Sequence, residues 1–199
     1  MRAYKRYNNR AFTLVELMIV VAIIGVLAAL AIYGVRRYMA SAKTSEAKNN
    51  IGAISRAASS AYERENVSPE ILVPGQSSTG TSHALCTDAT PVPVTMPAGN
   101  KFQPAEADWG GATDLTGWRC LKFAVTQPIY YQYQYSTSGN FQNLGTAVLP
   151  AHQGAEYFDA VATGDLDADN EPSAFARGGD VINGQLVLAT QLYVNNEYE

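Results

Sequence analysis

Three aspartates stand at alternate positions of one short segment, and this spacing suits the binding of a metal ion. Asp165, Asp167 and Asp169 carry hard carboxylate oxygens, which calcium-binding loops use because several oxygens must converge on one ion. An EF-hand loop is excluded, since its closing position needs glutamate and here holds Ala176. The same residues also suit a solvated turn between two strands, with Asn170 in a left-handed conformation. Calcium binding and a simple acidic turn are therefore alternatives, and no cofactor is expected to be required.

Cys86 and Cys120 are the two cysteines of the chain. A zinc site would need a larger cluster of ligands, and a redox pair would usually have Cys-x-x-Cys spacing. If this region lies outside the cytoplasm, a single structural disulfide is the natural interpretation. Two buried free thiols are the alternative.

Residues 12–32 form an apolar run that contains one charged residue, Glu16. About 20 apolar residues suffice for a helix to cross the hydrocarbon core of a membrane. A carboxylate inside such a segment costs about 2.5–3.5 kcal/mol on insertion scales. Glu16 is therefore either solvated by headgroups and favoured by the helix dipole, or kept for a cationic partner.

Four basic residues precede the apolar run, namely Arg2, Lys5, Arg6 and Arg10. The positive-inside rule then predicts that residues 1–11 lie in the cytoplasm and the C-terminus across the membrane. A secretory signal peptide is the competing interpretation. Its apolar region would be shorter and would end at a small-residue cleavage site followed by a break in the helix, whereas here the helical pattern continues.

Beyond the apolar run, apolar residues recur at spacings of three and four, which predicts an amphipathic helix with one narrow apolar stripe. The stripe consists of Ala47, Ile51, Ile54, Ala58 and Ala61 or Tyr62. Asn66 and Pro69 are expected to end the helix. The sequence thus predicts one helix over residues 13–65, apolar on all sides in its first half and on one side in its second.

Residues 11–25, AFTLVELMIVVAIIG, resemble the processing and assembly signature of type IV prepilins. The shared features are a basic leader, a small residue, a phenylalanine, and a glutamate four residues later inside an apolar span. The resemblance implies that a prepilin peptidase removes residues 1–11 by cutting between Ala11 and Phe12, and methylates the new amino group of Phe12. It also implies that Glu16 registers each incoming subunit in the filament, with the Phe12 amine of a neighbouring subunit as its cationic partner.

The sequence departs from the family pattern at two positions. Ala11 occupies the position before the cleavage site, which is usually glycine. Tyr33 occupies a position that is usually proline, and in assembled pili of this family the helix is often unwound between a glycine, here Gly25, and that proline. Tyr33 keeps the backbone donor that proline removes, so unwinding here would depend on Gly25 and Gly34.

The resemblance implies a membrane-spanning and filament-core helix half at residues 12–33, an amphipathic half at 34–66, and a globular head at 67–199. Within the head, residues 67–117 are rich in Pro, Gly, Ser and Thr and are expected to form a long surface loop. Residues 118–199 are expected to carry the sheet and the C-terminal region.

Strand-like segments separated by turn residues predict a roughly four-stranded antiparallel sheet. The expected strands are residues 119–125, 129–135, 157–164 and 185–194, with 173–177 as a short addition. Tyr131, Tyr133 and Tyr135 alternate with Gln132 and Gln134, a pattern typical of a half-exposed strand. The predicted fold class is α+β, with the long helix packed on the sheet, as in the pilin head.

Charge and motifs exclude two classes of function. Without residues 1–11 the chain has 10 basic and 18 acidic residues, whereas phosphate binding requires clustered Lys and Arg, so no specific nucleic-acid site is expected. The sequence has no nucleophile elbow, phosphate loop or Cys–His arrangement, so an enzyme is not expected.

The resemblance implies a structural subunit of a type IV pilus that serves surface motility, adhesion or DNA uptake. The expected partners are further copies of the chain in a homo-oligomeric helical filament, the prepilin peptidase, an inner-membrane assembly platform and an outer-membrane secretin. The precursor is expected in the inner membrane and the mature protein in an extracellular pilus of a Gram-negative bacterium. A type II secretion pseudopilin and a minor pilin at the tip are alternatives.

Overall fold

The computed structural model describes residues 12–66, 73–75, 77, 81–111 and 113–198. The leader expected at residues 1–11 and the helix-stopping Pro69 lie outside these described residues. The chain forms two compact units, Met1–Met39 and Ala40–Glu199, and one helix runs through the boundary between them. Every described strand belongs to the second unit, so the head includes the C-terminal part of that helix.

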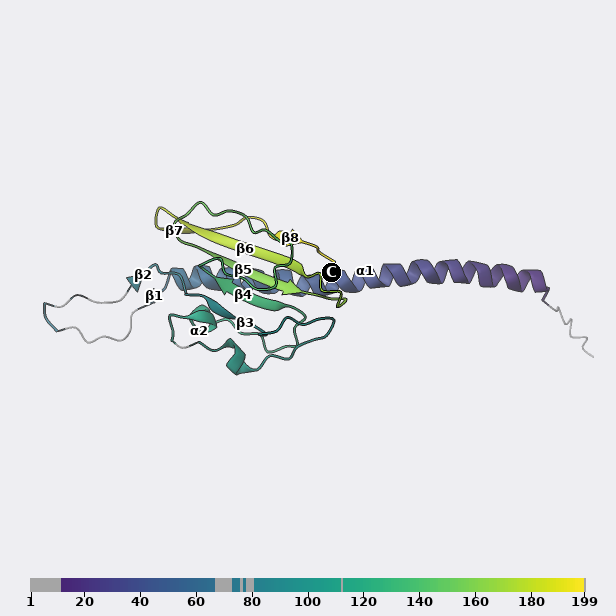
Figure 1. Cartoon of the computed structure of the whole chain (residues 1–199), viewed down its shortest axis with the longest axis horizontal. Helices are drawn as coiled ribbons and strands as arrows, with labels where there is room; N and C mark the ends of the chain where they lie inside the picture. Colours follow the sequence, from purple (N-terminus) through teal and green to yellow (C-terminus); the bar gives the residue numbers. More distant parts are fainter. Residues whose placement is uncertain (1–11, 67–72, 76, 78–80, 112, 199) are drawn as a thin grey trace, which may run out of the picture. The chain divides into compact units, whose positions relative to one another are not determined.

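Helix α1 spans Leu14–Tyr62 without interruption (Figure 1). This confirms the single long helix that the sequence predicts over residues 13–65. Gly25, Tyr33 and Gly34 are all helical, so the single chain is not unwound at these positions. Among the described residues, α1 is the one helix with the length and composition to cross a membrane.

The part of α1 in the second unit buries one stripe of residues, largely at the predicted spacing of three and four. The buried residues are Thr44, Ala47, Ile51, Gly52, Ile54, Ser55, Ala58, Ala61 and Tyr62. Two polar contacts then fix the position of the helix on the sheet. Asn50 Nδ2 donates to the Tyr133 hydroxyl at 2.7 Å, and that hydroxyl donates to Glu46 Oε1 at 3.2 Å.

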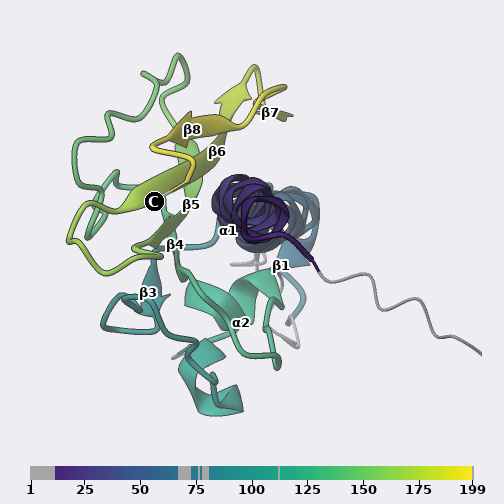
Figure 2. The ribbon, with the colours of Figure 1, turned by 90° about the vertical axis from the view of Figure 1, so that its right-hand side faces the viewer.

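The head contains an antiparallel six-stranded sheet. Its strands are β3 (Ala89–Val92), β4 (Gln132–Ser136), β5 (Tyr157–Gly164), β6 (Ser173–Ile182), β7 (Gln185–Leu188) and β8 (Tyr193–Asn195). Strands β3 to β7 follow one another in the sheet, and β8 also pairs with β6. The C-terminal part of α1 lies along one face of these strands (Figure 2), and the opposite face is called the outer face below. The predicted α+β class, with a long helix on an antiparallel sheet, is confirmed.

The strand predicted over residues 119–125 is not present. These residues contain the end of a short helix, α2 (Gly117–Leu121), followed by irregular chain. Trp118, Cys120 and Leu121 are all buried, a spacing that fits a helical turn and not an alternating strand. Lys122 then takes a left-handed conformation with φ of 53°, which ends the helix.

The other strands follow the predictions with two changes of extent. Residues 173–177 are not a short addition but the start of β6, which has strands on both sides. Residues 185–194 divide into β7 and β8, because the chain leaves the sheet between them.

Strand β3 lies in the region predicted as loop, where Pro91 and Pro93 hide the strand pattern. Within the same region, η1 (Glu106–Trp109) is a short 3-10 helix, and β2 (Thr81–Ser82) pairs with β1 (Glu65–Asn66).

Strand β4 is buried on both faces, so the prediction of a half-exposed strand was wrong. The tyrosines lie in the core with α1, and Gln132 is 0% exposed and Gln134 is 2% exposed. Gln132 Nε2 donates to the carbonyls of Pro93 and Val94 at 2.7 and 3.0 Å, and Gln134 Nε2 donates to the Gln142 carbonyl at 2.8 Å. Loops therefore cover the outer face here, and buried amides satisfy the backbone groups of those loops.

Candidate functional site

The start of α1 brings Thr13 and Glu16 together. The Thr13 amide and hydroxyl donate to Glu16 Oε2 at 2.9 and 2.8 Å, and the Glu16 amide donates to the Thr13 hydroxyl at 3.2 Å. This is a capping box, in which two side chains satisfy N–H groups that the first turn of a helix leaves without partners. The sequence reasoning missed Thr13, although its Thr-x-x-Glu spacing signals such a cap. The observed partner of Glu16 thus lies in its own chain.

The apolar side chains around Glu16 are exposed. Phe12 is 83% exposed, and every large apolar side chain from Leu14 to Met39 is at least 50% exposed. Glu16 is the single acidic residue of this segment. A continuous apolar surface of this extent is unfavourable in water, so the segment requires lipid or other apolar helices around it.

Cys86 and Cys120 form a disulfide, with their Cα atoms 5.8 Å apart. Both residues are 1% exposed. The bond joins the chain just before β3 to helix α2, so it fastens the covering loops of the head to its core. The expected structural disulfide is present, in place of two free thiols.

Asp165 is the centre of the acidic turn between β5 and β6. Its side chain is buried, and its Oδ1 accepts hydrogen bonds from the amides of Ala168 and Asp169 at 2.6 and 3.3 Å. Its Oδ2 accepts a hydrogen bond from the Asn170 amide at 3.0 Å. Asn170 has a φ of 73°, in agreement with the left-handed conformation expected for a turn.

The same turn gathers three carboxylates. Oxygens of Asp165, Asp167 and Asp169 lie within 4.8 Å of one another, and Asp167 and Asp169 are exposed. An all-oxygen set of this kind suits calcium. Asp165 already accepts three backbone hydrogen bonds, so this residue organises the turn whether or not it also binds an ion.

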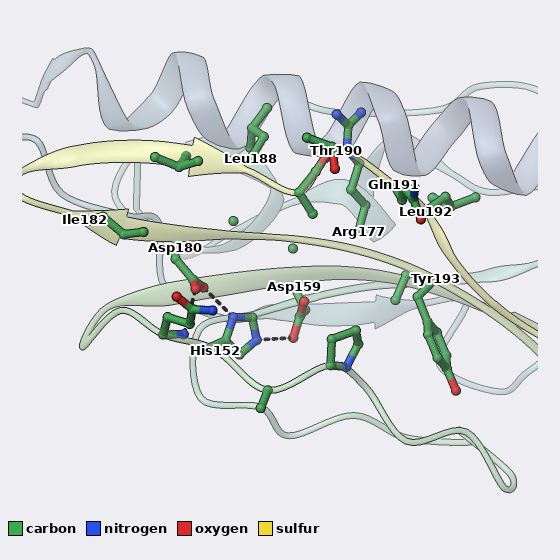
Figure 3. A pocket seen from close by; sticks show the side chains of 18 of the residues that line it. His152, Asp159, Arg177, Asp180, Ile182, Leu188, Thr190, Gln191, Leu192 and Tyr193 are labelled. Atoms are coloured by element: carbon green, nitrogen blue, oxygen red, sulfur yellow. Dashed lines mark hydrogen bonds and ion pairs between the residues drawn. The ribbon is translucent and has the colours of Figure 1, made fainter.

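A groove of about 580 Å³ lies on the outer face of the sheet, over β6 (Figure 3). Residues 150–153 line one wall, and residues 187–194 line the other. In the first wall, His152 contacts Asp180 and Asp159 through its two ring nitrogens, at 2.5 and 2.8 Å. With both nitrogens occupied by carboxylates, His152 is not available to activate a nucleophile.

The sequence reasoning did not identify this His–Asp cluster. His152, Asp159 and Asp180 are separated by tens of residues and follow no motif spacing. They meet because β5 and β6 pair antiparallel, with Asp159 opposite Gly178, and because the chain before β5 crosses the outer face. Such a cluster depends on strand register, which a motif search does not contain.

Comparison with known proteins agrees with the geometry at the start of α1. The family described as prokaryotic N-terminal methylation motif matches residues 6–32, which include Phe12, Thr13 and Glu16. Residues 6–32 thus carry the N-terminal methylation motif that the sequence resemblance indicated. The resemblance of the chain to type IV pilins, first drawn from residues 11–25, is confirmed.

Two relatives carry names of the same kind. Type IV major pilin protein PilA of Myxococcus xanthus (strain DK1622) is 51% identical over 63 residues, which are 31% of this chain and 29% of the relative. Fimbrial protein EcpC of Eikenella corrodens is 47% identical over 61 residues, which are 31% of this chain and 40% of the relative. These names denote structural subunits and not enzymes. The matched part of the chain spans less than half the length of either relative, and no solved structure matches the chain.

Proposed function

We propose that this chain is the structural subunit of a type IV pilus, anchored in the membrane as a precursor and then assembled into a surface filament. The observation that carries the proposal is the exposed apolar helix that begins with a prepilin methylation motif. Such a helix can be covered by lipid before assembly and by the helices of neighbouring subunits after it. One segment therefore suits both environments.

Glu16 supplies the specificity of assembly. After cleavage between Ala11 and Phe12, the new amino group of Phe12 is a cation next to an apolar helix. A carboxylate surrounded by apolar helices is costly unless a cation compensates it. Pairing the Phe12 amine of one subunit with Glu16 of its neighbour compensates both charges and sets the axial step between subunits.

The proposed partners follow from this role. A prepilin peptidase removes residues 1–11 and methylates Phe12, further copies of the chain form the filament, and an inner-membrane platform and an outer-membrane secretin guide it to the surface of a Gram-negative cell. Surface motility, adhesion and DNA uptake are the proposed uses of the filament.

The Glu16→Ala variant, expressed as the sole copy, tests this role. Cleaved subunits should accumulate in the membrane fraction, because alanine removes a charge from the apolar segment, but no filaments should be seen by electron microscopy. Glu16→Asp is the matched control, since it keeps the charge on a shorter side chain, and it should retain part of the filament yield. Normal piliation with Glu16→Ala would refute the pairing.

A type II secretion pseudopilin is the second candidate. Pseudopilins of that kind carry a calcium-binding loop, and the gathered carboxylates of Asp165, Asp167 and Asp169 would suit one. The amount of protein at the cell surface separates the two. A major pilin should dominate the fraction sheared from intact cells, whereas a pseudopilin should stay with the cell envelope. A trace amount in the sheared fraction would favour a minor pilin at the tip.

A further inference from the structure

The chain before β5 contacts the outer face of the sheet through a histidine ring and neighbouring backbone amides. The His152 ring lies between the carboxylates of Asp159 on β5 and Asp180 on β6 (Figure 3). The amide of the next residue, Gln153, donates to the second oxygen of Asp180 at 2.8 Å. Residues 152–154 are therefore fastened to two neighbouring strands through the His152 ring and the amides of Gln153 and Gly154. Further along, the Val181 amide donates to the Glu156 carbonyl at 2.8 Å.

Glycines make room for this arrangement. A Cβ on Gly178 would lie 2.3 Å from Asp159 Oδ1 and 3.2 Å from His152 Cε1. A Cβ on Gly154 would lie 2.8 Å from the carbonyl oxygen of Val181. Both distances below 3 Å are closer than nonbonded atoms approach, so the close fit depends on glycine at these positions.

The ring also stacks on an aromatic side chain. His152 and Tyr157 have ring centroids 3.9 Å apart and planes that differ by 12°. The stacking fixes the plane of the imidazole, so that its two nitrogens point to opposite sides. With one carboxylate on each side, both nitrogens can be satisfied at once when both carry a proton.

Electrostatics favour that doubly protonated ring. Burial by itself would lower the pKa of His152, but the hydrogen bonds and charges of Asp159 and Asp180 outweigh burial and raise it. For Asp180, burial is outweighed by hydrogen bonds from Gln153 and His152, so its pKa is lowered. Burial raises the pKa of Asp159, and the nearby His152 offsets part of this effect.

Other charged and titratable groups near the cluster come from each packed element. Arg177 of β6 lines the groove, and its Nε donates to the Ala189 carbonyl at 3.0 Å. The Tyr193 hydroxyl of β8 accepts a hydrogen bond from the Val148 amide at 3.2 Å, and Glu156 is exposed on the same segment as His152. Asp159 and Asp180 are thus the groups in direct hydrogen-bond contact with the ring among the described residues.

We propose that His152 is a pH-sensitive latch, which as an imidazolium holds residues 150–154 against β5 and β6 and as a neutral ring releases them. A neutral imidazole has one N–H, so a lone pair then faces one of the two carboxylates and that contact becomes repulsive. Because residues 150–153 form one wall of the groove, release of the latch opens the groove on that side. The latch is independent of the role of α1 in assembly.

The direction of the pH dependence follows from the raised pKa of His152. Its stabilising contribution is complete below the ordinary value of 6.5 and is lost as pH rises through the higher value of the folded chain. On the acid side, Asp159 takes up a proton earlier than an ordinary aspartate, while Asp180 stays charged and keeps its contact. The latch is therefore closed in mildly acidic solution and opens as pH rises through the raised pKa of His152.

Hydrogen exchange measured by mass spectrometry on the full chain in detergent micelles tests the latch. Peptides covering residues 150–158 should be protected at pH 6 and should lose protection, relative to intrinsic exchange, as pH rises through the pKa of His152. The expected loss is about tenfold for each pH unit by which folding raises that pKa. His152→Gln should remove this step. His83→Gln is the matched control, because His83 is the other histidine of the chain, and it should keep the step.

The absence of a step in the unaltered chain, or a step of the same size in His152→Gln, would overturn the proposal. A second measurement does not depend on that variant folding. In His83→Gln, the imidazole nitrogen signals of His152 should show a doubly protonated ring at pH 6 and titrate together with the loss of protection. A neutral ring at pH 6 would also overturn it.

Discussion

At the scale of single residues, Glu16 has one observed partner and one proposed partner. The observed partner is Thr13, which caps the same helix. The proposed partner is the amine of Phe12 in a neighbouring subunit. The two roles are compatible, because a carboxylate has enough lone pairs to accept hydrogen bonds from both.

The variant Thr13→Val separates capping from assembly. Loss of the hydroxyl should weaken the start of the helix by about 0.5–2 kcal/mol, the usual range for a removed cap. Filaments should still form, because Glu16 keeps its charge. Electron microscopy of Thr13→Val beside Glu16→Ala makes the comparison. If both variants lost filaments equally, capping alone would explain the requirement for Glu16.

The acidic turn yields a second prediction. If Asp165, Asp167 and Asp169 bind calcium, the Tm of the head should be higher in millimolar calcium than in chelator, because an ion that binds the folded state stabilises it. Magnesium should substitute poorly, since it requires a tighter octahedral shell. The difference should vanish in a double variant, Asp167→Ala with Asp169→Ala, which leaves the turn-forming Asp165 in place. Equal Tm values with calcium and with chelator would contradict calcium binding and would support a simple solvated turn.

The residues that could be predicted from the sequence are those that belong to local patterns. Phe12 and Glu16 lie in a contiguous motif, and Asp165 to Asp169 lie in one short turn. His152 could not be predicted, because its partners arrive from two strands whose register is not a local property of the sequence. The register of paired strands can be inferred from the sequence when one face is buried and the other is exposed. Both faces of β4 and β5 are buried, so burial does not distinguish one face from the other.

At the scale of elements, the disulfide fastens a loop-rich region to a short helix. Cys86 and Cys120 are 34 positions apart, and closing a loop of this length should contribute about 3–4 kcal/mol by restricting the unfolded chain. Reductant should therefore lower the Tm of the full chain in detergent. A double variant, Cys86→Ser with Cys120→Ser, should melt at the reduced value with or without reductant. Unreacted thiols titrated on the native, untreated protein would show that the bond does not form.

The buried amides of β4 predict the cost of removing one. In Gln132→Leu, the carbonyls of Pro93 and Val94 lose their donor while remaining covered, which should lower the free energy of unfolding by about 1–3 kcal/mol. Gln185→Leu on β7 is the matched control, because Gln185 is exposed, and it should have little effect. Chemical denaturation of both variants makes the comparison. If both variants changed the free energy of unfolding by the same small amount, the outer face would be open to water at Gln132.

The long helix and the long strands were predicted from the sequence better than the short elements and loops that cover the sheet. The apolar run and the stripe of α1 extend over many turns, and β5 has bounds equal to those predicted. Helix α2 and strand β3 are short, and tertiary contacts determine them. A disulfide and buried tryptophans hold α2, and pairing with β4 defines β3, which contains Pro91 and is followed by Pro93. The covered outer face was missed because loops rich in Pro, Gly and Ser give no periodic signal.

At the scale of the whole molecule, one continuous α1 belongs both to the apolar N-terminal segment and to the head. The head carries its own core, its disulfide and the His152 cluster. The segment before Met39 keeps its apolar side chains exposed. A molecule divided in this way is suited to a filament in which helices are covered and heads remain at the surface.

The most direct test of the proposed filament subunit is the intact mass of the protein in filaments sheared from cells. The account predicts a chain that lacks residues 1–11, begins at Phe12 and carries one additional methyl group on its amino terminus. Fragmentation of the N-terminal peptide should place that methyl group on Phe12. Subunits that retain Met1, or sheared filaments that contain none of this chain, would contradict the account.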